Sequence, residues 1–366
     1  MEQQKKQKTV VLGLSGGVDS SVAALLLKKQ GYKVIGVFMK NYSDTKDPIT
    51  GECSWVEEKK MAQKVAAILE ILFITIDYEK QYKSLVINEM FKSYKSGLTP
   101  NPDILCNKII KFPALWKEAK KLKADFIATG HYTRIKKLKN KYALFQGKDK
   151  TKDQSYFLCD LTQDDLSHTL FPLGNLKKSQ VREIAKKNKF PNWDKKGTRG
   201  ICFIGKLDMK SFLKKKIPER TGNVLSPEGL IIGTHPGSSY FTIGERVGER
   251  KGFSINKEFK KCYTGKLYVA EKTKNIITLA PESHPLLKKS QIFIKNFYKI
   301  NPKEKIPDNL KARIRHLSSL VRGKLIKKGN KMLFKFNRLQ KALAPGQTIV
   351  LYSNEKLIAS GEIRLK

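Results

Sequence analysis

The chain has 366 residues, and its 73 Lys or Arg against 33 Asp or Glu give a formal net charge of +40. This length favours two or three domains, and a hydrophobic fraction of 40% excludes a disordered polycation. No apolar run reaches the roughly 18 residues of a membrane span, so we expect neither a membrane anchor nor a signal peptide. Five scattered cysteines without a C-x-x-C pair favour neither a disulfide framework nor a zinc ribbon, and we expect a cytoplasmic protein.

The positive charge has two interpretations. Only 11 of the basic residues are Arg, and the lysines are spread through nearly every segment. Such uniform enrichment can reflect a mutational bias towards lysine codons, with most side chains on solvated faces. The alternative is a polyanionic partner, because a large positive field attracts phosphate backbones and releases their counterions. Composition alone leaves both open.

The first 130 residues alternate between apolar runs typical of buried strands and amphipathic runs typical of helices. This alternation predicts an α/β domain with a Rossmann-like parallel sheet and right-handed crossovers. The predicted strands cover 9–14, 34–39, 71–77 and 124–129, and the predicted helices cover 19–29, 56–69, 81–94 and 108–121.

The alternation ends near residue 205, where short runs and turn signals replace it. We therefore expect a catalytic domain over 1–207, a small β-rich central domain over 208–285 and a C-terminal β-barrel over 286–366. The strands predicted in the last domain cover 292–294, 310–314, 331–336, 348–352 and 357–363.

A glycine-rich loop joins the first predicted strand to the first helix. It lies at the carboxyl end of a parallel sheet, where backbone N–H groups and a helix N-terminus bind phosphate. The plain alternative is a tight turn with an Asp or Ser cap. The loop lacks the Gly-Lys-Ser/Thr end of a Walker loop and resembles the loop of the ATP pyrophosphatase superfamily, which adenylates a substrate oxygen. The candidate ATP-binding residues here are Gly13, Leu14, Ser15, Gly16, Gly17, Val18, Asp19 and Ser20.

Two cysteines stand in distinctive segments. Cys106 follows the turn Asn101-Pro102-Asp103, and if Asp103 caps a helix there, the helix dipole and nearby lysines favour a thiolate at Cys106. Cys202 lies in Gly200-Ile201-Cys202-Phe203, which by residue type alone resembles a core strand.

Motifs along nearly the whole chain, taken together, resemble those of the bacterial tRNA-uridine 2-sulfurtransferases, or 2-thiouridylases. In chain order these are S-G-G-V-D-S-S, N-P-D-x-x-C-N, A-T-G-H-Y, K-D-Q-S-Y-F-L, G-I-C-F-I-G, Y-F-T-I-G and A-P-G-Q. The two cysteine motifs are far more specific to this family than the ATP loop is.

This resemblance implies a reaction on the wobble uridine of a tRNA anticodon. ATP on the glycine loop, with Met39 and Gly130 at the adenosine and Mg²⁺ arriving with it, would adenylate the C2 oxygen of the uracil. Cys202 would carry a persulfide received from a sulfur-relay protein or a cysteine desulfurase. Cys106 would act as the nucleophile that resolves it, leaving a Cys106–Cys202 disulfide for a reductant to clear.

The resemblance also implies substrate contacts. Asp103 would be a general acid or base, and Asn101, Pro102 and Asp103 would surround the flipped base, whose extrusion from a single-stranded loop is inexpensive. The implied tRNA contacts are Lys152, Asp153, Gln154, Arg313 and Ile314. No His/Cys/Asp cluster has metal-ligand spacing, so we expect no zinc or iron–sulfur site.

The sequence departs from the family in the last domain, where relatives commonly carry Arg-Tyr and this chain has Arg313-Ile314. An aromatic stacking contact is therefore not expected there, although Arg313 could reach phosphate. Two other functions remain as alternatives. An amide ligase of the same superfamily would not need the cysteines, and a non-catalytic basic tRNA-binding protein would bind RNA without turnover.

Overall fold

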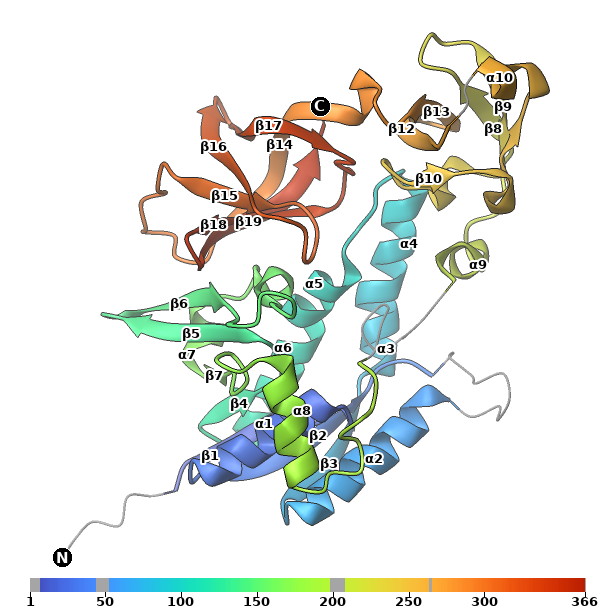
Figure 1. The fold of residues 1–366 in the computed structure, drawn as a ribbon. Helices are drawn as coiled ribbons and strands as arrows, with labels where there is room; N and C mark the ends of the chain where they lie inside the picture. The colour runs from blue at the N-terminus through green and yellow to red at the C-terminus, as the bar shows by residue number, and fades with distance from the viewer. Residues whose placement is uncertain (1–6, 44–52, 198–207, 263–264, 366) are drawn as a thin grey trace, which may run out of the picture.

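The computed structural model describes residues 7–43, 53–197, 208–262 and 265–365. It contains three units, an α/β domain, a central β-rich unit and a β-barrel (Figure 1). In Figure 1 the α/β domain lies below the other two, and helix α4 reaches from it towards the central unit.

The α/β domain is built on a five-stranded sheet in the order β3-β2-β1-β4-β7, and every neighbouring pair is parallel. The order reverses between β1 and β4, and the crevice outside the carboxyl ends of strands at such a point is where open α/β sheets bind ligands. The strands are β1 Thr9–Gly13, β2 Lys33–Lys40, β3 Leu72–Asp77, β4 Phe126–Ala128 and β7 Thr169–Leu170.

Helices cover both faces of this sheet. Val10 and Leu12 of β1 pack in one apolar cluster with α1, α2 and α8, whereas Val11 packs in another with α4 and α6. This alternation is the period-two pattern of a strand buried on both faces. The helices of the domain are α1 Val18–Lys29, α2 Ser54–Ile68, α3 Glu79–Tyr82, α4 Asn88–Lys95, α5 Pro102–Cys106, α6 Phe112–Lys121, α7 Gln163–Ser167 and α8 Lys178–Lys187.

Two of the predicted helices are longer than expected, and each consists of two α-helices joined by a π-helical turn; we call each such unit a rod. A π-helical turn, Lys83–Ile87, joins α3 to α4, and a second, Asn107–Lys111, joins α5 to α6. The second rod begins at Pro102 rather than at the predicted residue 108, which places Cys106 inside it. The other strands and helices expected in the first 130 residues are confirmed, with bounds within two residues.

The central unit is a six-stranded sheet in the order β10-β12-β13-β8-β9-β11, which confirms the β-rich middle segment. Its strands are β8 Gly222–Leu225, β9 Ile231–His235, β10 Arg246–Val247, β11 Ser254–Ile255, β12 Leu267–Thr273 and β13 Ile276–Pro281, and its helices are α9 Met209–Lys214 and α10 Lys257–Cys262.

The C-terminal strands form a closed barrel, as predicted. Their order is β14-β17-β16-β15-β18-β19, and pairing of β14 with β19 closes the ring. The strands are β14 Lys288–Lys299, β15 Leu310–Arg313, β16 Val321–Lys328, β17 Lys331–Lys341, β18 Thr348–Ser353 and β19 Lys356–Arg364. The sequence analysis missed β16, whose inward positions include Gly323, because a glycine among lysines gives no apolar alternation.

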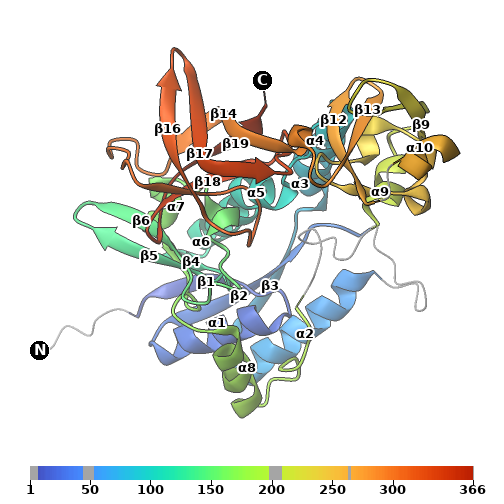
Figure 2. The same cartoon turned by 45° about the horizontal axis from the view of Figure 1, so that its top comes forward.

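A hairpin of the α/β domain extends the barrel sheet. Strands β5 Thr133–Leu138 and β6 Lys141–Gln146, which the sequence analysis also missed, continue that sheet beyond β19. The joint is a bridge between Lys356 and Phe145, and the Gln146 N–H also donates to the Glu355 carbonyl at 2.9 Å. Figure 2 shows the hairpin beside the barrel. The α/β domain and the barrel therefore share a sheet.

Candidate active site

The loop after β1 is shaped by glycines. Gly16 has φ +75, and a Cβ there would lie 2.2 Å from the Glu58 carbonyl oxygen of α2. Only glycine fits both the left-handed backbone and this close approach. Gly130, after β4, is equally confined, because its Cβ would lie 2.9 Å from the Asp19 carbonyl carbon. The loops after β1 and β4 therefore meet at the strand-order reversal.

Serine hydroxyls hold the loop in place. Ser20 Oγ donates to the Gly17 carbonyl at 3.0 Å and accepts from the Ser15 N–H at 3.2 Å. Ser15 Oγ lies 3.2 Å from Ser20 Oγ. Gly17 caps α1 without a side-chain hydrogen bond, so the helix dipole and first-turn N–H groups suit an anion. This geometry fits a phosphate-binding loop.

Asp19 lies at the mouth of the loop with two partners from distant segments. Its Oδ1 accepts from the Tyr132 hydroxyl at 2.7 Å and from Lys178 Nζ at 2.5 Å. Burial and the neighbouring carboxylate raise the pKa of Tyr132, so it stays a neutral donor. The sequence analysis missed Tyr132 and Lys178 as site residues. Tyr132 ends the A-T-G-H-Y motif and Lys178 begins a helix, but neither feature indicates that these side chains meet Asp19, which lies 113 and 159 positions away.

The expected adenosine contacts differ in accessibility. Met39, near the end of β2, is 7% exposed and belongs to the core cluster around α4 and α6. His131 follows Gly130, and a hydrogen bond of 2.7 Å joins its Nδ1 to Thr129 Oγ1. Burial lowers the pKa of His131 well below its usual value, so its ring is neutral near pH 7. Gly130 lies beside the first turn of α1 and Met39 lies in the core, and contact of either residue with adenosine stays a prediction.

Asn101, not Asp103, caps the helix that contains Cys106. Asn101 Oδ1 accepts from the N–H groups of Asp103 and Ile104, each at 3.2 Å. Pro102 takes the first helical position, where its fixed φ suits the helix and its missing N–H costs nothing. The cap predicted at Asp103 is therefore wrong, and Cys106 falls just beyond the first turn.

Cys106 is fully buried, and Asp103 is partly exposed. A π-helical turn follows Cys106 directly, and such turns are frequent at functional sites. Cys202, the other predicted sulfur carrier, lies outside the described residues. Its approach to Cys106 stays a prediction.

The rod that carries Cys106 lies over the nucleotide loop. A Cβ on Gly13 would be 3.4 Å from Leu115 Cδ1, so α6 packs where the loop begins. After the end of α6, the Asp125 N–H donates at 2.9 Å to the carbonyl of Thr9, the first residue of β1. The helix α6 therefore runs antiparallel to β1. Cys106 precedes Leu115 by nine residues, which corresponds to about 13 Å of helix. Because Leu115 packs at the carboxyl end of β1, Cys106 lies beyond that edge of the sheet. Cys106 and the loop therefore lie at the same edge of the sheet.

Two of the expected RNA contacts form an internal ion pair. Asp153 is 0% exposed, and its Oδ2 lies 2.5 Å from Nη1 of Arg313, which is itself 5% exposed. Asp153 Oδ1 accepts from the N–H groups of Gly147 and Ser155. A phosphate contact by Arg313 does not fit this burial, because its guanidinium is already paired within the protein.

The neighbours of this pair are divided between surface and interior. Lys152 is exposed, which is compatible with the expected RNA contact but does not test it. Gln154 uses its Oε1 to accept from the Tyr132 N–H at 3.0 Å, and Ile314 is 9% exposed. Of these residues, only the pair of Asp153 and Arg313 joins the α/β domain to the barrel, and contact of any of them with RNA stays a prediction.

Replacing Asp153 with alanine is expected to lower the free energy of unfolding by about 3–5 kcal/mol, because it leaves the Arg313 guanidinium buried without its carboxylate. Urea unfolding measures this loss. The control is Glu89→Ala, which removes an exposed partner of Lys92 and should change stability by less than about 1 kcal/mol. If Asp153→Ala left the free energy of unfolding nearly unchanged and weakened RNA binding, Asp153 would contact RNA directly, as the sequence predicts.

Cys53 and Cys159 make contacts inside the protein and match no catalytic motif. Cys53 Sγ lies 2.8 Å from the Ser43 carbonyl, and Cys159 is fully buried. Burial raises the pKa of the Cys159 thiol, which keeps it protonated and unreactive. Within the described ranges no cluster of three His, Cys, Asp or Glu side chains suits a metal ion. No described helix is long and apolar enough to cross a membrane.

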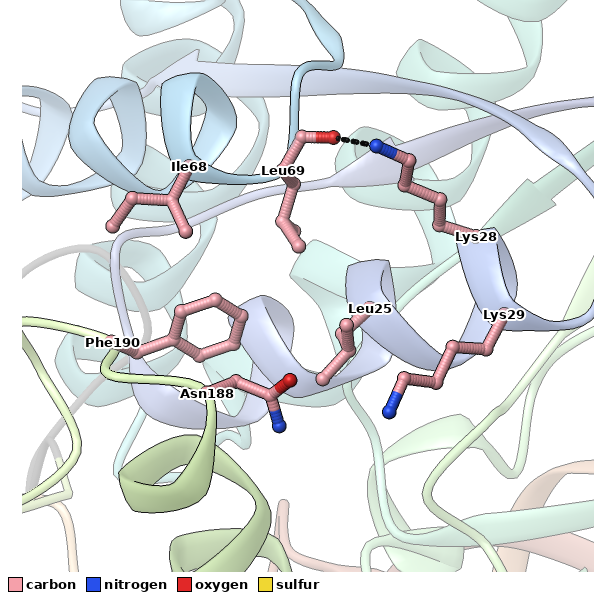
Figure 3. Close-up of a pocket in the computed structure, with 7 residues that line it drawn as sticks. All are labelled: Leu25, Lys28, Lys29, Ile68, Leu69, Asn188 and Phe190. Carbon is pink, nitrogen blue, oxygen red and sulfur yellow. Dashed lines mark hydrogen bonds between the residues drawn. The ribbon is translucent and has the colours of Figure 1, made fainter.

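A cavity of about 330 Å³ lies away from this site (Figure 3). It opens between the C-terminal ends of α1 and α2 and the segment after α8. Because α1 begins at the loop and spans about 18 Å, the cavity is at the opposite edge of the domain. Its lining residues are Leu25, Lys28, Lys29, Ile68, Leu69, Asn188 and Phe190. It is therefore separate from the nucleotide loop.

The fold and the loop define a nucleotide-binding α/β protein that carries two β domains. Three family descriptions match it in chain order: a tRNA methyl transferase HUP domain over residues 8–206, a tRNA methyl transferase PRC-barrel domain over 210–280 and an aminomethyltransferase β-barrel domain over 289–363. The chain belongs to the tRNA-specific 2-thiouridylase family.

Curated relatives match along nearly their whole length. The tRNA-specific 2-thiouridylase MnmA of Karelsulcia muelleri (strain GWSS) is 43% identical, over 98% of this chain and 99% of its own. The protein of the same name from Bacillus subtilis (strain 168) is 39% identical, over 99% of this chain and 96% of its own. Among solved structures, a 4-thiouridine synthetase in complex with RNA and bound ATP covers 58% of this chain and 50% of its own, with 17% identity and a TM-score of 0.35. That last likeness is too weak to bear on function.

Proposed function

We propose that this protein uses ATP to replace the C2 oxygen of the wobble uridine in tRNA anticodons with sulfur. Membership of the 2-thiouridylase family supports tRNA thiolation, and its HUP domain supports the use of ATP. The observation that carries the proposal furthest is the placement of the Cys106 rod, which projects beyond the same sheet edge as the phosphate-type loop. A cytoplasmic location remains a prediction.

In the first step, the loop from Gly13 to Ser20 holds the phosphates of ATP while the uracil O2 attacks the α-phosphorus and pyrophosphate leaves. Asp19 and the serine hydroxyls are the oxygen ligands that Mg²⁺ prefers, and that ion would neutralise phosphate charge. Lys178, within 2.5 Å of Asp19, can turn its ammonium group to the same phosphates. AMP bound through O2 is then a good leaving group.

In the second step, the terminal sulfur of a Cys202 persulfide attacks C2, and AMP departs with the former O2. The Cys106 thiolate then attacks the inner Cys202 sulfur and breaks the S–S bond. The electron pair of that bond goes to the sulfur on C2, which gives 2-thiouridine. A Cys106–Cys202 disulfide remains, and a dithiol reductant returns both thiols. A sulfur-relay protein or a cysteine desulfurase supplies the persulfide sulfur.

Asp103, which is partly exposed one turn before Cys106, is the candidate general acid or base. With Asn101 and Pro102 it forms the N-terminal end of α5, and these three residues are the proposed contacts of a flipped base. Lys152 is the exposed member of the expected RNA contacts.

The direct test incubates the full chain with unmodified tRNA, ATP, Mg²⁺ and a persulfide donor, and analyses the digested nucleosides by mass spectrometry. We expect 2-thiouridine only when ATP is present. AMP formation without sulfur incorporation, or amidation of another substrate, would favour an amide ligase. Tight tRNA binding without AMP formation would favour a non-catalytic binding protein.

Binding of tRNA is expected to weaken steeply with salt, because lysines that neutralise phosphates release condensed counterions. If six or more phosphates are contacted, affinity should fall about 10³-fold or more between about 50 and about 200 mM salt. Filter binding at several salt concentrations measures the slope. A flat response would assign the lysine excess to codon bias instead of RNA recognition.

A further inference from the structure

The short segment Leu98–Asn101 connects α4 to the Cys106 helix and is held by both β domains. The Thr99 N–H donates to the Pro345 carbonyl of the barrel at 2.8 Å. Thr99 Oγ1 lies 3.2 Å from Thr242 Oγ1 of the central unit. Thr99 itself is 9% exposed. One residue, two positions before the helix cap, thus contacts all three units.

The barrel contact comes from the turn Ala344–Gln347, which is the A-P-G-Q motif. Gln347 Nε2 donates to the carbonyls of Thr99 and Pro100, at 2.9 and 3.2 Å. A Cβ on Gly346 would lie 2.8 Å from the Thr99 nitrogen, so the turn presses directly against the segment. Two further bonds fix the turn to β19, from the Gly346 N–H to the Ile363 carbonyl and from the Ile363 N–H to the Gln347 carbonyl.

The central contact comes from the turn Thr242–Gly244, in the Y-F-T-I-G motif. Lys272 Nζ donates at 2.5 Å to the carbonyl of Phe241, the residue before this turn, and so stabilises the turn. A Cβ on Gly244 would lie 2.1 Å from Ala342 Cβ of the barrel, so the two turns also touch each other. Arg315 Nη2, from the segment that follows β15, donates to the Ala342 carbonyl at 2.6 Å.

The helix cap itself is linked to the barrel. The Asn101 side chain hydrogen-bonds Tyr156, whose hydroxyl donates to the Thr348 carbonyl at 2.7 Å. Thr348 follows Gln347 directly. The register of α5, and with it the position of the Cys106 thiol, is therefore determined by residues almost 250 positions further along the chain.

We propose that Gln347 and Thr242 are positioning residues for sulfur transfer, which latch the Cys106 helix to the barrel and to the central unit. The proposal rests on the thiolation function described above. The A-P-G-Q and T-I-G turns set the position of the N-terminal end of α5, and with it the position of Cys106. Neither side chain contacts the reacting atoms.

The amide of Gln347 makes a sharp test, because it donates to two carbonyl oxygens. Gln347→Glu keeps the shape but places a carboxylate against both oxygens, and Gln347→Met keeps the length without charge. A displacement of about 1 Å at a reacting group can reduce the rate about 10²-fold. We therefore expect kcat for 2-thiouridine formation to fall about 10²-fold in both variants, with an unchanged KM for tRNA and unchanged first-turnover AMP formation.

The matched control is Gln340→Glu. Gln340 lies on the same barrel, but its amide donates to Arg338 and Leu339 of its own strand. The same chemical change there should leave kcat within the error of the assay. A wild-type kcat for the Gln347 variants, or a loss confined to KM, would overturn the proposal.

Alkylation of the thiols tests the latch without thiolation. Cys106 and Cys159 are both 0% exposed, and Cys159 lies against the barrel, where Ser360 Oγ is 3.4 Å from its carbonyl. In Gln347→Glu, iodoacetamide labelling of Cys106 should accelerate about tenfold, because the segment before α5 opens locally, while labelling of Cys159 should not change.

Equal acceleration at both thiols would mean that Gln347 only stabilises the barrel, and would refute the latch. A wild-type chain that forms no 2-thiouridine would refute the thiolation function instead. The alkylation result would then still decide the latch, so the two failures are distinguishable.

Discussion

Cys106→Ala is expected to abolish 2-thiouridine formation, with a loss of at least about 10⁴-fold, as is typical when a covalent nucleophile is removed. Without this thiol the sulfur already bonded to C2 cannot be released from Cys202. First-turnover AMP formation should persist, because the glycine loop is intact. Binding of tRNA should persist too, because the Cys106 side chain is fully buried and contributes no outer surface. Nucleoside mass spectrometry and filter binding measure the two outcomes.

Cys159→Ala is the matched control for this change. Both thiols are 0% exposed, but Cys159 lies against the barrel, where Ser360 Oγ is 3.4 Å from its carbonyl, and it matches no catalytic motif. This variant should lose stability but keep its rate of thiolation. The loss predicted for Cys106→Ala is also expected of Cys202→Ala. Wild-type turnover in Cys106→Ala would remove Cys106 from the mechanism.

Asp19→Asn is expected to reduce tRNA-dependent AMP formation by about 10²–10³-fold, the usual range for loss of one preorganised electrostatic contact. The change removes the negative charge that would hold Mg²⁺ and that now holds Lys178 at 2.5 Å. Thiolation should fall in parallel, because it follows adenylation. Radiolabelled ATP, with separation of AMP from ADP, measures the effect.

Asp125→Asn is the control, because Asp125 contacts the first residue of β1, at the end of that strand opposite to the loop. Asp125 Oδ2 accepts from the Thr9 N–H at 2.7 Å, at the edge of the sheet opposite to the loop. It should change stability slightly and leave AMP formation unaffected. If Asp19→Asn retained full AMP formation, the loop after β1 would not be the adenylation site.

Local sequence determined the glycine loop and much of the sheet. The strand 9–13, the glycines and the helix from Val18 are contiguous, so hydrophobic periodicity and backbone freedom are both encoded within about 20 residues. The same holds for most strands of the closed barrel, but not for β16, which has no clear apolar alternation. The cap at α5 was misassigned by two residues, because Asn and Asp both cap helices and only the observed hydrogen bonds distinguish Asn101 from Asp103.

Family motifs identified residues whose physical role the sequence could not reveal. The pair of Asp153 and Arg313 spans 160 positions, and its burial follows from the joint between the α/β domain and the barrel. Lys178 reaches Asp19 across 159 positions. Nothing in the composition of either segment distinguishes a buried ion pair from an exposed RNA contact.

The sequence by itself thus determined the class of fold, the nucleotide loop and the two candidate thiols, because these depend on short-range patterns and on motifs. The tertiary structure alone decided which side chains surround Asp19, how the hairpin 133–146 joins the barrel, and how Gln347 reaches the segment before Cys106 across 248 positions. Such contacts depend on the packing of whole domains against one another, and no local pattern in the chain encodes that packing.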